Sequence, residues 1–198
     1  MRIARSKKLA AEPSDRRMEI LSAAAQQFAL KGYAATSMRD IAAVAGLLAG
    51  SIYHHFASKD DRVLEAYKAG VERVIAAHDL AIANVSDPWD RLEAACVAHL
   101  ECLLADDALA RLLPLDLRQL PAELRRKLVL ERDRYERRFL TLVNGVVVAH
   151  EPDARFARMM LLGALNWTTT WYKRGGEAPR KIASAFVRLL RGGLATRR

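Results

Sequence analysis

The chain has 198 residues, and 52% of them are hydrophobic, which is enough for a buried core and too much for a disordered chain. The formal net charge of +9 favours an anionic partner such as nucleic acid, an acidic ligand or a membrane surface. Charged residues interrupt every apolar stretch, which excludes a run of membrane-spanning length. The basic N-terminus has no long apolar core after it, so it is not typical of a secretory signal, and we expect a cytoplasmic protein.

Glycine and proline are sparse, and they lie between runs whose apolar residues repeat with helical spacing. No stretch alternates in the way a half-buried strand would. We therefore predict an all-α protein of about nine helices. Two cysteines, Cys96 and Cys102, lie six positions apart within one predicted helix and thus on different faces, so we expect no disulfide between them.

The first predicted helix begins near Ser14 or Asp15, because either side chain can accept hydrogen bonds from unpaired N–H groups. It ends at Gly32, a residue that suits the left-handed position after a helix. The second helix starts after Ser37, whose side chain can form a capping box with Asp40. These signals predict two helices separated by a sharp break.

Gly46 ends the second helix, and a short third helix is predicted over residues 49–56. A fourth, long helix follows Ser58 and runs towards Val85. The second and third helices have the layout of a helix-turn-helix, whose second helix enters the major groove of DNA. The apolar residues expected to face inward are Ile41, Val44, Leu47, Ile52 and Phe56.

Polar groups around the third helix are expected to contact DNA. Gly50 and Ser51 lie at a helix N-terminus, where backbone N–H groups and the helix dipole favour a phosphate. The Tyr53 hydroxyl and the Lys59 ammonium can reach phosphates as well. Arg39 can contact a phosphate or the edge of a guanine.

His54 and His55 are also left near the outside of this helix. Neighbours on a helix point about 100° apart, and no carboxylate or cysteine accompanies these histidines, so we predict neither a metal site nor a cofactor. The basic N-terminal arm is expected to be a solvated tail in the free protein and to follow a minor groove or the backbone when DNA is bound. Its cations are Arg2, Arg5, Lys7 and Lys8.

The segment from about Ser14 to Tyr67 resembles the N-terminal domain of the TetR family of transcriptional regulators. The matching residues are Gly32-Tyr33, Thr36-Ser37, Ile41-Ala42, Ala45-Gly46, Gly50-Ser51-Ile52-Tyr53-His54-His55-Phe56 and Ser58-Lys59. The resemblance implies an all-α homodimer, with a three-helix helix-turn-helix domain over residues 14–74. A larger helical domain over residues 75–198 would bind an effector and dimerise.

The same resemblance implies further DNA contacts at Thr36, Ser37 and Ala49. The chain departs from the family at Leu48, where members commonly have serine or threonine, and at Ala49, where they commonly have lysine or proline. A side-chain cap or phosphate contact is therefore lost at these positions.

The last two predicted helices carry apolar stripes suited to a four-helix bundle between two subunits. Such a bundle is the dimer interface of the TetR family, and the resemblance extends to it. Trp167 and Trp171 lie four positions apart on one helix face. Packing in a core or in this interface explains them at least as well as ligand contact does. The residues assigned to the interface are Met160, Gly163, Ala164, Trp171, Ile182, Phe186, Leu189 and Leu190.

The stretch from Asn166 to Gly176 is similar to the ending of TetR-type repressors that govern the breakdown of fatty acids or sterol-derived acids. Those repressors respond to coenzyme A thioesters, and the basic surface of this chain suits a ligand that bears phosphates. An effector pocket should be mainly apolar with a few placed polar groups. The residues assigned to it are Leu103, Leu104, Leu112, Leu117, Arg118, Tyr135, Phe139, Met159, Leu162, Asn166 and Trp167.

The sequence thus predicts a repressor that binds a double-stranded, pseudo-palindromic operator as a homodimer, is released by a small effector and has no membrane partner. An activator, or a sensor of drugs and small lipophilic compounds with the same fold, is the alternative. A helical enzyme is more remote, because no catalytic arrangement or phosphate loop is visible. A module that binds any polyanion through charge alone is equally remote.

Overall fold

The structure is a computed structural model that describes residues 13–48, 50–51, 56, 58–146 and 151–195. All regular structure within these ranges is helical, which confirms the predicted all-α class. Two short 3-10 helices, η2 (Ala110–Leu112) and η3 (Leu117–Gln119), lie between the fourth and fifth α-helices. The α-helices are α1 (Pro13–Ala35), α2 (Met38–Val44), α3 (Lys59–Ile82), α4 (Pro88–Leu104), α5 (Ala122–Val146), α6 (Glu151–Trp171) and α7 (Pro179–Ala195).

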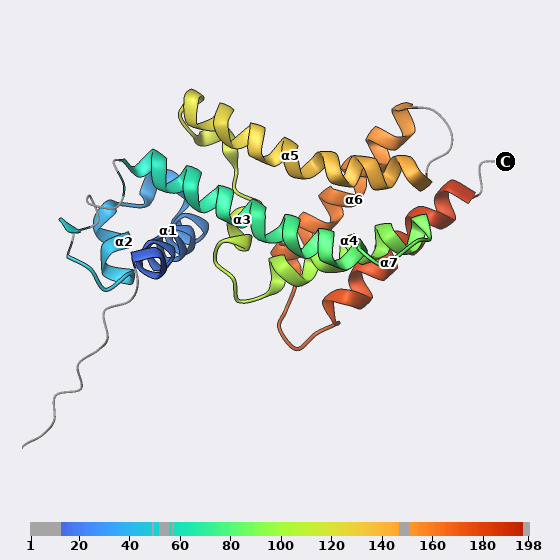
Figure 1. Ribbon diagram of the computed structural model, residues 1–198, viewed down its shortest axis with the longest axis horizontal. Helices are drawn as coiled ribbons and strands as arrows, with labels where there is room; N and C mark the ends of the chain where they lie inside the picture. The colour runs from blue at the N-terminus through green and yellow to red at the C-terminus, as the bar shows by residue number, and fades with distance from the viewer. Residues whose placement is uncertain (1–12, 49, 52–55, 57, 147–150, 196–198) are drawn as a thin grey trace, which may run out of the picture.

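Helix α3 connects the two ends of the molecule (Figure 1). Helices α1 and α2 lie near its beginning, α4 and α5 pack along the rest of it, and α6 and α7 pack in turn on α4. An ion pair between Arg17 and Glu65 joins α1 to the first turns of α3, and one between Arg138 and Asp79 joins α5 to its last turns. The division predicted between residues 74 and 75 falls inside this continuous helix.

The helix ends predicted at Gly32 and Ser37 agree with the structure, whereas most of the helix predicted over residues 49–56 lies outside the described residues. Gly32 breaks the helical geometry of α1 with a φ of 76°, in the left-handed region that glycine adopts without strain. Ser37 caps α2 and forms the expected capping box with Asp40. Asp87 accepts hydrogen bonds from two backbone N–H groups at the start of α4, where Pro88 occupies the first turn.

The loop after α4 is packed tightly onto α3 at Gly70. A Cβ atom at this position would lie 2.3 Å from the carbonyl oxygen of Leu109, so only glycine permits the contact. The hydroxyl of Tyr67 also donates to the carbonyl oxygen of Leu113 at 3.4 Å. The segment that carries η2 is therefore fixed directly to α3.

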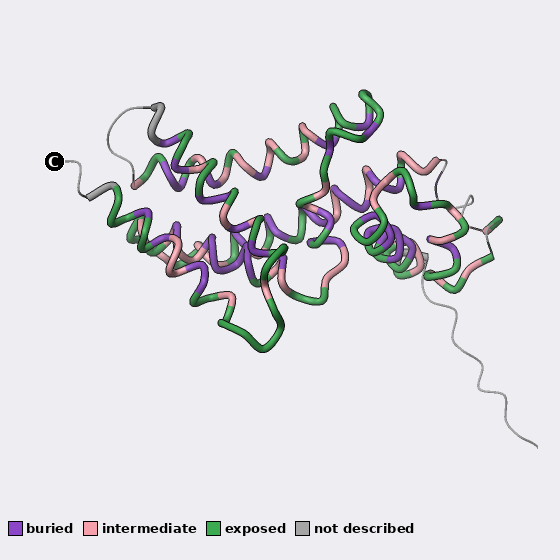
Figure 2. The backbone as a smooth tube through the Cα atoms, turned by 180° about the vertical axis from the view of Figure 1, so that it is seen from behind, coloured by how far each residue is buried: buried purple, intermediate pink, exposed green. Residues whose placement is uncertain are grey.

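Figure 2 shows the core as buried residues along the inner sides of the helices, with exposed residues on the outer sides. Cys96 is buried and Cys102 is half-buried, and both are free thiols, as expected. Across the described ranges, no helix is both long enough and apolar enough to cross a bilayer.

Candidate nucleic-acid interface and effector cavity

The corner after α2 is closed by two backbone hydrogen bonds. The N–H of Leu47 donates to the carbonyl of Ala42 at 2.9 Å, and the N–H of Gly46 donates to the carbonyl of Ala43 at 3.3 Å. This pair is the Schellman pattern, which needs a left-handed residue at its centre, and Gly46 supplies it with a φ of 65°. The short α2 is thus held at both ends by local contacts, which fixes the angle at which the next segment leaves.

The inner face of α2 differs from the prediction at one position. Ile41 and Ala42 are fully buried and Ala45 packs against the core, but Val44 is 47% exposed. Each residue of a helix is rotated by about 100° from the last, so Val44 lies well away from the arc that Ile41, Ala42 and Ala45 define. The expectation that Val44 faces inward was therefore wrong.

Thr36 has a structural role at the end of α1. Its side chain is buried, and its hydroxyl, which has one proton to donate, lies 2.7 Å from the carbonyl oxygen of Gly32 and 3.1 Å from that of Gln27. The hydroxyl thus ties Thr36 back to the last turns of α1. Ser37, Arg39, Gly50 and Ser51, by contrast, are exposed or half-exposed along the corner. The remaining residues assigned to DNA lie outside the described residues, namely Ala49, Tyr53, His54 and His55.

Lys59 is held in place by an aromatic ring. Its ammonium lies 4.1 Å from the centroid of the Tyr33 ring, and the hydroxyl of Tyr33 donates to the carboxylate of Asp60. Burial raises the pKa of Tyr33 to about 12 and lowers the pKa of Lys59. The lysine therefore presents its charge from a fixed position beside the corner.

Arg62, another cation of α3, is buried beside Phe56. Arg62 is fully buried, and its guanidinium donates to the carbonyls of Ser58 at 2.8 Å and of Phe56 at 3.1 Å. It also lies over the Phe56 ring, at 5.3 Å from the centroid. Arg17 of α1 lies over the same ring at 4.4 Å. Helices α1 and α3 thus hold Phe56 with two guanidinium groups, and we name Arg17, Phe56 and Arg62 the arginine clamp.

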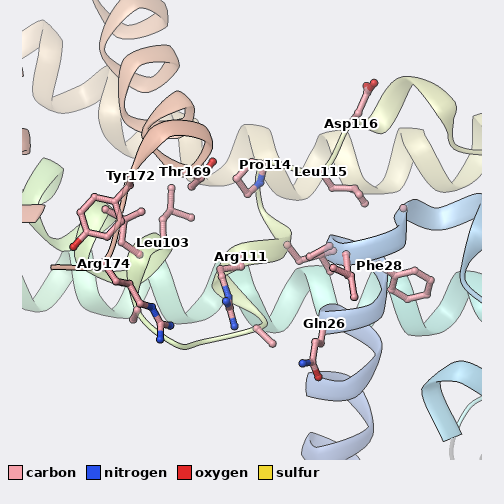
Figure 3. A pocket seen from close by; sticks show the side chains of 17 residues that line it. Gln26, Phe28, Leu103, Arg111, Pro114, Leu115, Asp116, Thr169, Tyr172 and Arg174 are labelled. Atoms are coloured by element: carbon pink, nitrogen blue, oxygen red, sulfur yellow. The ribbon is translucent and has the colours of Figure 1, made fainter. Parts of the chain in front are cut away.

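A cavity of about 650 Å³ lies where α1 meets the ends of α4 and α6, and we name it the junction cavity (Figure 3). Its apolar wall includes Phe28, Leu103 and Leu112, which are all buried. Arg111 and Arg174 lie on its rim, and both pair with the carboxylate of Asp106. The cavity therefore combines an apolar interior with a cationic edge.

A polar cluster lies in the core between α4, α5 and α6. Nε2 of His99 is 3.1 Å from the amide oxygen of Asn166, and Nδ1 is 2.5 Å from the hydroxyl of Tyr135. Because an amide oxygen can only accept, Nε2 carries the proton and the tyrosine hydroxyl donates to Nδ1. Burial lowers the pKa of His99 to about 4, so the ring is neutral at neutral pH.

The residues assigned to an effector pocket do not share one place. Leu103, Leu104 and Leu112 line the junction cavity, whereas Tyr135, Leu162 and Asn166 border a second cavity of about 40 Å³ beside His99. Phe139 and Leu117 are buried in the core, and Arg118 is exposed and paired with Asp116. Met159 and Trp167 lie on the surface of α6.

The residues assigned to a dimer interface lie on α6 and α7. Met160, Trp171 and Leu189 are exposed, and Leu189 is exposed by 73%. Ile182 and Leu190 are buried beneath them, and Ala164 and Phe186 are half-buried. Gly163 is exposed on the same helix as Met160. An apolar groove between the two helices, which we name the α6–α7 face, is lined by Phe156, Met159, Met160, Ala164, Phe186, Leu189 and Leu190. Trp171 and Ile182 line a neighbouring groove instead.

Sequence reasoning missed the arginine clamp and half of the cavity rim. Arg62 lies in the sequence among other charged residues at a helix start, where a solvated side chain is the ordinary expectation. Arg111 likewise gave no signal, and Arg174 lies in the stretch from Asn166 to Gly176 but was not assigned to the effector pocket. Within the described ranges, no group of three or more histidine, cysteine or acidic residues is placed to hold a metal ion.

Comparison with known proteins shows to which family the segment around the corner belongs. Residues 20–66 match the family model described as bacterial regulatory proteins of the tetR family, and residues 85–194 match the model for the tetracyclin repressor-like C-terminal domain. The transcriptional repressor KstR2 of Mycobacterium tuberculosis H37Rv is 28% identical, with 94% of this chain and 96% of that protein covered. The fatty acid metabolism regulator protein of Bacillus subtilis is 28% identical, with 78% and 82% covered.

A solved structure shows the same fold. The fatty acid degradation regulator FadR of Bacillus halodurans superposes with a TM-score of 0.76 at 27% identity, covering 93% of this chain and 98% of that one. The fold and the corner therefore define a helix-turn-helix transcriptional regulator, which binds DNA and is not an enzyme. The chain belongs to the TetR family.

Proposed function

We propose that this protein is a cytoplasmic repressor that binds a pseudo-palindromic operator as a homodimer and leaves it when a coenzyme A thioester binds. Residues 14–74 would read DNA, and residues 75–198 would dimerise and bind the effector. The proposal rests chiefly on the α6–α7 face, because this face exposes Phe156, Met159, Met160 and Leu189 around one groove, and clustered exposed apolar residues mark interaction sites. Trp167 is 65% exposed on the same helix, close in sequence to this face.

A two-fold dimer is the natural way to cover the α6–α7 face. Contact between two copies of this face would bury the exposed methionines and Leu189 and form the four-helix bundle expected from the sequence. Because one short helix-turn-helix reads few bases, a second copy doubles the contacts and accounts for a pseudo-palindromic operator. The residues proposed to take part in DNA binding are one buried residue at the end of α1, the exposed groups of the corner and the residues that follow it: Thr36, Ser37, Arg39, Ala49, Gly50, Ser51, Tyr53, His54, His55 and Lys59.

The roles of two of these residues are narrower than those of the others. Thr36 uses its hydroxyl inside the protein, so it would act through the position of α2 rather than by touching DNA. Ala49 lacks a polar side chain, so it would offer its backbone. The strongest phosphate contact is expected from Lys59, whose ammonium is already oriented by Tyr33.

Two observations favour a coenzyme A thioester as the effector. The matched relatives are named as regulators of fatty acid metabolism and, in KstR2, as a repressor. The chain also carries a formal net charge of +9 and a cavity with apolar walls and a cationic rim, which suit a long acyl group joined to phosphates.

The test is a DNase footprint on the DNA around the protein's own gene, repeated with a panel of acyl-coenzyme A thioesters and with the corresponding free acids. A protected site with two-fold symmetry that disappears with a thioester supports the proposal. Equal binding to scrambled DNA at moderate salt would replace it with non-specific polyanion binding. Tighter operator binding on addition of thioester would make the effector a corepressor.

A further inference from the structure

We infer that the junction cavity binds an anionic amphiphile, with the apolar chain against Phe28, Leu103 and Leu112 and the anionic head on Arg111 and Arg174. The inference rests on the proposed function, since it gives the effector a site and a chemical class. It also assigns the ligand a direct contact with α1, one of the helices that position the DNA-reading corner.

The rim of the junction cavity carries more positive than negative charge, which favours the binding of an anion. Arg111 is 2.9 Å and Arg174 is 3.3 Å from the same carboxylate oxygen of Asp106, so two guanidinium groups share one negative charge. The other acid on the rim, Asp116, is already paired with Arg118. Each guanidinium has five N–H donors in a planar fork, which suits a carboxylate or a phosphate. One positive charge is thus left for a ligand.

The interior of the cavity suits an alkyl chain. Phe28 comes from α1, Leu103 from α4 and Leu112 from η2, so three elements contribute apolar side chains to it. The volume of about 650 Å³ lies within the range of roughly 300–1,000 Å³ that is usual for small-molecule sites. In Figure 3 the arginine side chains lie beside the apolar wall, which matches a molecule with a charged end and an apolar end.

The position of the cavity links its ligand to the DNA-binding unit. One wall is the end of α1, from Gln26 to Gly32, and the opposite wall is the segment that carries η2. This segment is fixed to α3 by the close contact at Gly70. A ligand between the walls has an affinity that depends on where α1 lies relative to α3. By linkage, binding of that ligand must shift the position of α1.

The experiment measures ligand binding to the full-length protein without DNA by isothermal titration calorimetry. The probes are decanoyl-coenzyme A, decanoate and the uncharged 1-decanol. The double variant Arg111→Gln, Arg174→Gln removes the cationic rim, and Ala29→Trp fills the cavity from the exposed surface of α1. Arg125→Gln and Ala76→Trp are matched controls, because both positions are exposed and neither lines the cavity.

We expect a charged probe to bind the wild type and both controls equally. We expect binding to weaken at least tenfold in the double variant and to be lost in Ala29→Trp, with 1-decanol binding weakly and without dependence on the arginines. Equal affinity for decanoate and decanoyl-coenzyme A identifies a carboxylate-sized head, whereas binding of the thioester alone identifies the phosphates of coenzyme A. Both results support the site.

Operator binding separates this inference from the proposed function. Unligated operator affinity and the helical circular dichroism signal serve as folding controls for each variant. If both cavity variants bind the probes as the wild type does, or if no charged probe binds the wild type, the junction cavity is not the site. If thioesters still release the operator in that case, the proposed function stands without it. If the cavity binds as expected but no ligand releases DNA, the site stands and the proposed response fails.

Discussion

Arg62 donates to the backbone carbonyl of Phe56 at 3.1 Å and lies over the ring of the same residue. A fully buried guanidinium is costly unless its donors find acceptors, and here the carbonyls of Ser58 and Phe56 accept from its two terminal nitrogens. The contact ties the end of the DNA-reading segment to the helix that runs through both parts of the molecule.

The first prediction concerns this contact. Arg62→Lys should weaken operator binding by about tenfold, equivalent to about 1.4 kcal/mol, because a single ammonium cannot reproduce the planar fork that reaches two carbonyls. Fluorescence anisotropy with a labelled operator measures the loss, and circular dichroism should show an unchanged helix content. Arg125→Lys, on the exposed side of α5, is the control. Wild-type affinity in Arg62→Lys would show that the clamp does not position the reading segment.

A second prediction concerns Lys59 as a phosphate contact. Lys59→Ala should weaken operator binding at low salt and reduce the slope of log affinity against log salt by about 2 for the dimer, since one cation in each subunit no longer displaces a counterion. The measurement is a salt titration of operator affinity. An unchanged slope in this variant would assign Lys59 to packing against Tyr33 alone.

If the α6–α7 face is the dimer interface, a charge placed on it should lower the mass of the protein in solution. Leu189→Asp puts a charge at the centre of the α6–α7 face and should convert the dimer into a monomer, with operator affinity falling at least a hundredfold because one reading unit binds alone. Sedimentation velocity gives the mass. Leu80→Asp is the matched control, since Leu80 is similarly exposed but lies on α3. A dimeric Leu189→Asp would place the interface elsewhere.

The lowered pKa of the buried His99 predicts that the protein loses stability in mild acid. The folded pKa of His99, about 4, lies below its ordinary value of 6.5, so the unfolded chain binds a proton that the folded chain excludes. The stabilisation from this group is nearly complete at pH 7 and is lost as the pH falls towards 4; between pH 7 and pH 5 the loss is about 2 kcal/mol. His78 acts in the same direction, because burial lowers its pKa too.

Urea unfolding at fixed protein concentration, at pH 7 and pH 5, measures this loss. His99→Gln can still bond to Tyr135 or Asn166 but cannot be protonated, so it should show a smaller decrease in the free energy of unfolding than the wild type. A decrease of the same size in both proteins would assign the acid sensitivity to other groups.

The helix boundaries could be predicted from the sequence because local chemistry determines them. Ser37 with Asp40, Asp87 with Pro88, and Gly32 and Gly46 each act within one turn of the chain. The exposure of Val44 was not foreseen, since α2 is too short for its apolar residues to define a face clearly. The arginine clamp and the junction cavity join residues far apart in sequence, and nothing in the spacing of Arg17, Arg62, Arg111 or Arg174 signals where they meet.

Because α3 belongs to both parts of the molecule, neither part has a complete set of helices without it. Cutting the chain at residue 74 would remove the turns of α3 that carry Ile75 and His78, both buried against the larger part. The two parts should consequently melt together in a single cooperative transition, and an isolated reader built from the first 74 residues should be markedly less stable than the intact chain.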